Sequence, residues 1–108
     1  VYEVAAVYDG QLLDADLHLV RLKRSLGEIA LEGTPDASEW IAVMQTLVER
    51  NGITEGLVYL QVTRGPAERD FAFPTNVTPT AFAYARKKAL TADPNAGGVV
   101  LHAVPDLR

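Results

Sequence analysis

The order of the strand-like and helix-like segments is the feature that most restricts how this chain can fold. Residues 1–8 and 12–13 have the pattern of two strands joined by Asp9-Gly10, a composition that favours a two-residue hairpin turn. Two helical patterns follow directly, and further strand-like runs come only after them, at residues 57–63, 80–85 and 99–104. Since strands and helices do not alternate, we predict an α+β fold, an antiparallel sheet with two helices packed on one side.

The first helical pattern runs from residue 14 to about residue 31. We expect Asp14 or Asp16 to cap its start and Gly33 to end it. Apolar residues recur on one stripe at helical spacing, namely Leu19, Leu22, Leu26, Ile29 and Ala30.

The second helical pattern begins at Asp36, which forms a capping box with Glu39, and ends at Asn51-Gly52. Its apolar positions are Trp40, Val43, Met44, Leu47 and Val48. A long loop without a pattern of its own covers residues 65–79, and loops of this length often have a functional role.

Length and composition exclude several classes of protein. The 108 residues can bury one core, so we expect residues 1–108 to form a single α+β domain. The absence of cysteine excludes disulfides and thiolate nucleophiles, and with two histidines we expect no metal site. A net charge of −4 argues against nucleic acid as a partner, and no apolar run approaches the roughly 20 residues of a membrane span.

A few polar residues are candidates for binding an anion. His18 and Arg21 share one helical face, where the guanidinium could hold a phosphate through two parallel hydrogen bonds, unless this face is simply solvated. Tyr2 could bind a carboxylate or pack as a cross-strand aromatic residue. Arg69, in the long loop, is either an anion ligand or a surface residue paired with a neighbouring carboxylate.

The three lysines, Lys23, Lys87 and Lys88, lack the apolar surroundings that would lower the pKa of a nucleophilic amine. No Gly-rich phosphate loop is present. The residues by themselves therefore indicate an acidic α+β domain with a candidate anion site.

Three stretches together resemble one enzyme family. In chain order they are Val1-Tyr2-Glu3-Val4, His18-x-x-Arg21-Leu22-x-x-Ser25 and Tyr59-x-Gln61-Val62-Thr63-Arg64-Gly65 followed by Arg69. They are similar to the pyridoxal-phosphate-dependent aminotransferases of fold type IV (class IV), and most of all to the D-amino-acid aminotransferases. The resemblance covers essentially the whole chain.

This resemblance implies the small N-terminal domain of a longer, two-domain enzyme, in keeping with a sequence that starts inside a strand-like run and ends without a closing element. The enzyme would be a cytoplasmic homodimer that uses pyridoxal 5'-phosphate to move an amino group between a D-amino acid and a 2-oxo acid. Its Schiff-base lysine is expected beyond Arg108, so residues 1–108 would hold no catalytic residue and would be inactive alone.

The resemblance also implies roles for individual residues around the cofactor. Arg21 corresponds to the arginine that binds the cofactor phosphate. Glu3 and His18 correspond to polar groups close to it.

For the substrate, the resemblance places Tyr2 at the carboxylate and Val4 in an apolar wall. The loop around Arg69 would reach the neighbouring subunit's site, where Arg69 would complete the carboxylate trap. Some D-amino-acid aminotransferases have a histidine two residues further on, but this chain has Phe71, whose ring donates no hydrogen bond.

Other functions stay open from the sequence. Branched-chain aminotransferase and aminodeoxychorismate lyase belong to the same fold type. Arg69 favours the D-amino-acid interpretation, because it would place the substrate carboxylate on a defined side of the site. A different alternative is that the isolated segment is a non-catalytic domain.

Overall fold

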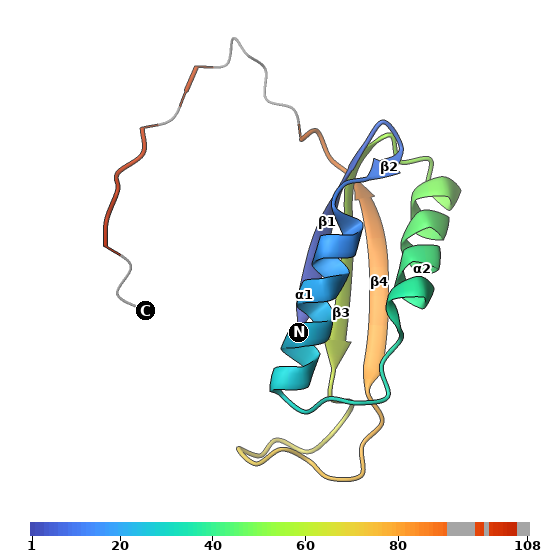
Figure 1. The fold of residues 1–108 in the computed structure, drawn as a ribbon, viewed down its shortest axis with the longest axis vertical. Helices are drawn as coiled ribbons and strands as arrows, with labels where there is room; N and C mark the ends of the chain where they lie inside the picture. The colour runs from blue at the N-terminus through green and yellow to red at the C-terminus, as the bar shows by residue number, and fades with distance from the viewer. Residues whose placement is uncertain (91–96, 99, 106–108) are drawn as a thin grey trace.

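The computed structural model describes residues 1–90, 97–98 and 100–105. It confirms the α+β fold, with a four-stranded antiparallel sheet in the order β2-β1-β3-β4 and two helices on one side (Figure 1). The elements are β1 (Tyr2–Tyr8), β2 (Gln11–Leu12), α1 (Ala15–Glu28), α2 (Ala37–Arg50), β3 (Glu55–Thr63) and β4 (Thr80–Lys87).

The predicted hairpin is present at the start of the chain. Asp9 and Gly10 have φ values of 49° and 72°, the left-handed pair that a tight hairpin turn between twisted strands requires. Because β2 pairs only with Val7 and Tyr8, the first residues of β1 lie at an edge of the sheet. On its other side β1 pairs with β3 along its full length, from Tyr2 opposite Gln61 to Tyr8 opposite Glu55.

The two faces of the sheet differ in what covers them. Along β1 and β3 every second residue is buried under the helices, and the fully buried residues of this layer include Val7, Val58, Leu60 and Val62 with Met44 of α2. The alternate residues, Tyr2 and Val4 among them, point to the opposite face, which no helix of the described residues covers (Figure 1). This alternation follows from the two-residue period of a strand.

The ends of the helices agree with the sequence only in part. The capping box of Asp36 and Glu39 is confirmed, and α2 ends before Asn51 as expected. Asp14 is the N-cap residue of α1, as one of the two predicted candidates, but the prediction of a side-chain cap and of an end at Gly33 was wrong. Asp14 adopts a left-handed conformation and makes no side-chain cap, and the helix stops at Glu28, where a reversal at Ala30 with φ 47° replaces the expected end at Gly33.

The strand predicted over residues 99–104 is wrong as far as the structure describes it. Residues 100–104 have no regular secondary structure and are exposed, and no described strand pairs with them. An apolar run becomes a strand only where a partner offers backbone hydrogen bonds, so its composition alone was not sufficient. Val99, the first residue of this run, lies outside the described residues.

Two glycines, one crowded and one with free space around it, test the packing of β3 against β4. A Cβ added at Gly56 of β3 would lie 2.2 Å from the Arg86 carbonyl oxygen, whereas one added at Gly27 of α1 meets nothing within 4 Å. We expect Gly56→Ala to lower the free energy of unfolding by about 3 kcal/mol through overpacking. Gly27→Ala should raise it by about 0.5–1 kcal/mol, because alanine restricts the unfolded chain. Urea titrations of both variants measure the two changes, and equal effects would contradict the close approach of β3 and β4.

Candidate functional site

A buried carboxylate lies at the centre of the candidate site. Glu3 is 3% exposed and is the buried charged residue among those that the structure describes. The strand period directs its side chain toward α1, while its neighbours Tyr2 and Val4 point to the open face. An ionised carboxylate in such a place requires partners that donate hydrogen bonds.

Those partners are His18 and Arg21, one helical turn apart on α1. Arg21 donates from Nε to Oε1 of Glu3 at 2.7 Å and from Nη2 to Oε2 at 2.5 Å, and His18 Nδ1 lies 2.9 Å from Oε2. The structure therefore brings together three residues that the resemblance associated with the cofactor. The alternative of a purely solvated helix face is wrong, although the Arg21 side chain remains 59% exposed.

The geometry of Arg21 leaves one side of its guanidinium for an anion. Nε and one N–H of Nη2 are occupied by Glu3, and a guanidinium has five N–H groups in a fixed plane. The end formed by Nη1 and the second N–H of Nη2 therefore presents two parallel donors, the arrangement that suits a phosphate. The site fits the phosphate of a cofactor at the open edge of β1.

The ion pair also shifts the pKa values of both residues. Burial alone would raise the pKa of Glu3, but the hydrogen bonds and charges of Arg21 and His18 outweigh it and hold that pKa below its ordinary value of 4.5. The hydrogen bonds and charge of Glu3 raise the pKa of Arg21, and Tyr2 makes a smaller contribution in the same direction.

The lowered pKa of Glu3 predicts a loss of stability in acid. Its folded pKa lies below the ordinary 4.5, so the ionised carboxylate stabilises the fold fully above pH 4.5 and stops doing so as the pH falls through the folded value. Thermal melting of Glu3→Gln should therefore differ from wild type at neutral pH and converge with it in acid. Glu28→Gln, at an exposed position, is the control and should follow wild type throughout. A Glu3→Gln difference that stays constant into acid would contradict this assignment.

The open face of the sheet carries a cluster of aromatic rings beside Tyr2. Tyr2 stacks on Tyr59 with a centroid distance of 5.6 Å, Tyr59 stacks on Tyr84 at 5.1 Å, and Phe82 lies 6.0 Å from Tyr59. Tyr2 is thus a cross-strand aromatic residue, but it is 63% exposed and keeps its ring at the surface. Val4 is half-exposed on the same face and lies opposite Tyr59 in the sheet.

The loop that contains Arg69 leaves the sheet at the end where Tyr2 lies (Figure 1). Its base is fixed by Arg64, which donates from Nη2 to the Ile29 carbonyl oxygen at 2.5 Å and lies 4.3 Å from the centroid of the Phe73 ring. Arg69 itself is exposed, and neither an ion pair with a neighbouring carboxylate nor a contact with Arg21 is found among the described residues. Phe71 is fully exposed.

The rest of the described chain adds no second reactive centre. Within residues 1–90 and the described positions after them, no group of three His, Asp or Glu side chains could hold a metal ion. Lys23, Lys87 and Lys88 are exposed. No helix in the same residues is long and apolar enough to cross a membrane.

Comparison with known proteins identifies similar sequences. The model of the amino-transferase class IV family matches residues 1–106. A D-alanine aminotransferase of Staphylococcus aureus (strain MSSA476) is 38% identical over 109 residues, which cover 100% of this chain and 39% of that protein. A D-alanine aminotransferase of Bacillus licheniformis is 38% identical over 84 residues, or 78% of this chain and 30% of that protein. The chain thus spans about two fifths of the length of the curated relatives it matches.

Solved structures with the same fold include two described as 4-amino-4-deoxychorismate lyases. The Legionella pneumophila protein has a TM-score of 0.75 at 16% identity and covers 87% of this chain and 35% of its own. The Pseudomonas aeruginosa protein has a TM-score of 0.67 at 22% identity, over 85% of this chain and 33% of its own. At these identities the likeness concerns the fold alone.

Proposed function

This chain belongs to the class IV aminotransferase family, and on that premise we propose that the intact protein is a pyridoxal-phosphate-dependent transaminase. Residues 1–108 would be its small N-terminal domain, and the lysine that reacts with the cofactor would lie in the rest of the protein. The orientation of Arg21 supports this proposal. Glu3 fixes one side of the guanidinium, and the two donors that remain are suited to the cofactor phosphate.

Each polar residue of the site has a separate task in this proposal. The cofactor, when bound, supplies the electron sink for the reaction at the substrate α-carbon. Arg21 would hold the phosphate, and Glu3 with His18 would keep Arg21 in position. A fixed phosphate sets where the reactive end of the cofactor lies, so these residues act on orientation rather than on proton transfer.

The substrate would bind on the open face of the sheet. The Tyr2 hydroxyl would donate to the substrate carboxylate, and Val4 would form an apolar wall beside it. Arg69 would complete the carboxylate trap in the neighbouring subunit of a homodimer. The exposure of Arg69, and the absence of a partner for it among the described residues, support a role outside its own domain.

We propose D-amino acids and 2-oxo acids as the substrates. The 38% identity to D-alanine aminotransferases over the whole chain supports this choice over the other members of the fold type. Phe71 replaces a histidine of some D-amino-acid aminotransferases, so the carboxylate would be held by Arg69 and Tyr2 without a third donor. The lyase is the second candidate, because aminodeoxychorismate lyase belongs to the same fold type that the sequence resembles.

Assays of the intact protein with D-alanine plus a 2-oxo acid, L-leucine plus a 2-oxo acid, and aminodeoxychorismate separate these functions. We expect amino transfer from D-alanine and none from L-leucine. Turnover of L-leucine alone would favour a branched-chain aminotransferase, and elimination from aminodeoxychorismate would favour the lyase. A cofactor-loaded intact protein that turns over none of the three would contradict the proposed transaminase.

A further inference from the structure

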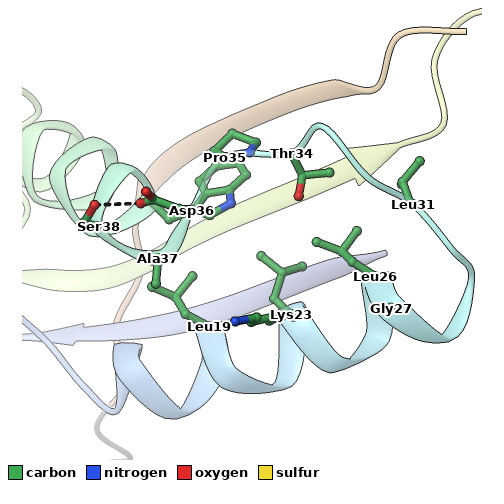
Figure 2. Close-up of a pocket in the computed structure, with 12 residues that line it drawn as sticks. Leu19, Lys23, Leu26, Gly27, Leu31, Thr34, Pro35, Asp36, Ala37 and Ser38 are labelled. Carbon is green, nitrogen blue, oxygen red and sulfur yellow. Dashed lines mark hydrogen bonds between the residues drawn. The ribbon is translucent and has the colours of Figure 1, made fainter.

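A pocket of about 580 Å³ lies on the helical side of the sheet, between α1 and the segment that leads into α2 (Figure 2). Its size is in the range of small-molecule sites. The apolar lining includes four leucines, Leu19, Leu22, Leu26 and Leu31. Because Tyr2 and Val4 point to the opposite face of the sheet, this pocket is separate from the proposed substrate site.

Trp40, at the first turn of α2, lines the pocket and has a buried side-chain donor. Its side chain is 3% exposed, and among the described residues its indole Nε1 is a buried side-chain atom without a hydrogen-bond partner. A buried N–H without an acceptor is unfavourable, because its hydration is lost and nothing replaces it. A ligand that places an oxygen acceptor at Nε1 would remove this penalty.

The other polar groups of the pocket favour an anionic acceptor. Lys23 projects from α1, and its ammonium has no ion pair among the described residues. The Oδ1 oxygen of Asp36 already accepts from Ser38 Oγ at 2.6 Å and from the Glu39 backbone N–H at 2.9 Å. Figure 2 shows the bond between Ser38 and Asp36, and the hydroxyl of Thr34 directed toward α1. The indole N–H of Trp40 and the ammonium of Lys23 are therefore donors without a partner among the described residues, and they belong to a pocket lined by leucines.

We propose that this pocket binds a small apolar monocarboxylate. The tail would lie among the leucines, and the carboxylate would accept from Trp40 Nε1 and pair with Lys23. This assignment depends on neither the cofactor nor the substrate, so a binding measurement tests it separately from the proposed function.

Titration of octanoate into the intact protein, followed through the NMR signal of the Trp40 indole N–H, tests the proposal. Trp40→Phe identifies that signal. We expect a saturable shift of the signal with octanoate and weaker binding of the neutral octanamide. Lys23→Met keeps the length of the side chain and removes its charge, so it should weaken octanoate about fivefold and leave octanamide unchanged.

Gly27 offers a variant that fills the pocket without changing its polar groups. Gly27 lines the pocket, and a Cβ there meets nothing within 4 Å, so Gly27→Leu fits the helix. It should weaken octanoate about tenfold or more, while Gly27→Ala, the matched control, keeps most of the affinity. The proposal is overturned if the Trp40 signal shows no saturable shift, if octanamide binds as tightly as octanoate, or if Gly27→Leu binds octanoate like wild type. Should Gly27→Leu fail to fold, Lys23→Met decides.

Discussion

Replacing Arg21 by alanine in the intact protein should lower its affinity for pyridoxal 5'-phosphate on the order of a hundredfold. The change removes the two parallel donors that Glu3 leaves available and also deprives the buried Glu3 carboxylate of its cation. Cofactor released during dialysis, followed by absorbance, measures the loss. With saturating cofactor, the ratio of kcat/KM between D-alanine and other amino acids should change less than the cofactor affinity.

Arg24→Ala is the matched control, because Arg24 is an exposed arginine three residues further along α1. It should retain the cofactor like wild type. This result would show that the cofactor affinity depends on an arginine at position 21 and not simply on the positive charge of α1. If Arg21→Ala kept its cofactor but changed its amino-acid preference, Arg21 would be a substrate residue and the phosphate assignment would be wrong.

Arg69→Ala should raise the KM of both the amino acid and the 2-oxo acid on the order of a hundredfold, with little loss of cofactor. The expected cause is the loss of a charge-assisted, two-pronged contact with the carboxylate that both substrates share. Steady-state kinetics with the two substrates varied in turn measure the change. Arg50→Ala, at an exposed position in the last turn of α2, should leave both KM values as in wild type.

A mixture of the two impaired variants, assayed at cofactor and substrate concentrations where each alone has little activity, shows which subunit Arg69 serves. In a mixed dimer of Arg69→Ala and Arg21→Ala subunits, one site has both arginines if the Arg69 loop reaches across the interface. Such dimers should recover up to about half of the wild-type activity, as expected for one of two equivalent sites. No recovery after subunit exchange would mean that Arg69 acts within its own subunit.

Local sequence patterns predicted those parts of the fold that local interactions determine. Asp9-Gly10 fixed the hairpin because its backbone conformation is rare for other residues. Asp36 with Glu39 predicted the start of α2, because the two residues satisfy each other's backbone donors. The two-residue period of a strand accounts for which residues of β1 are buried and which lie on the open face.

The errors concern features that depend on distant parts of the chain. The end of α1 could not be located from Gly33, because a non-glycine residue, Ala30, takes the left-handed conformation there. Residues 100–104 have the composition of a strand, yet no described strand pairs with them.

The candidate site was only partly visible in the sequence. Spacing placed His18 and Arg21 on one helical face, but it did not show that Glu3, fifteen residues before His18, lies between them. The family resemblance grouped Glu3 with His18 and Arg21, and the structure shows that hydrogen bonds to the Glu3 carboxylate hold the three together. The stacking of Tyr59 on Tyr2 was not predicted, because cross-strand register is not encoded locally. Trp40 was predicted as core, and its unsatisfied donor became visible only in three dimensions.

The most direct test of the phosphate site compares pyridoxal 5'-phosphate with pyridoxal, which lacks only the phosphate. Dissociation constants of both compounds are measured for the intact wild-type protein and for Arg21→Ala. We predict that wild type prefers the phosphorylated compound on the order of a hundredfold and that Arg21→Ala loses most of this preference. A preference that is the same in both proteins would contradict the assignment of Arg21, and with it the role of Glu3 in positioning it.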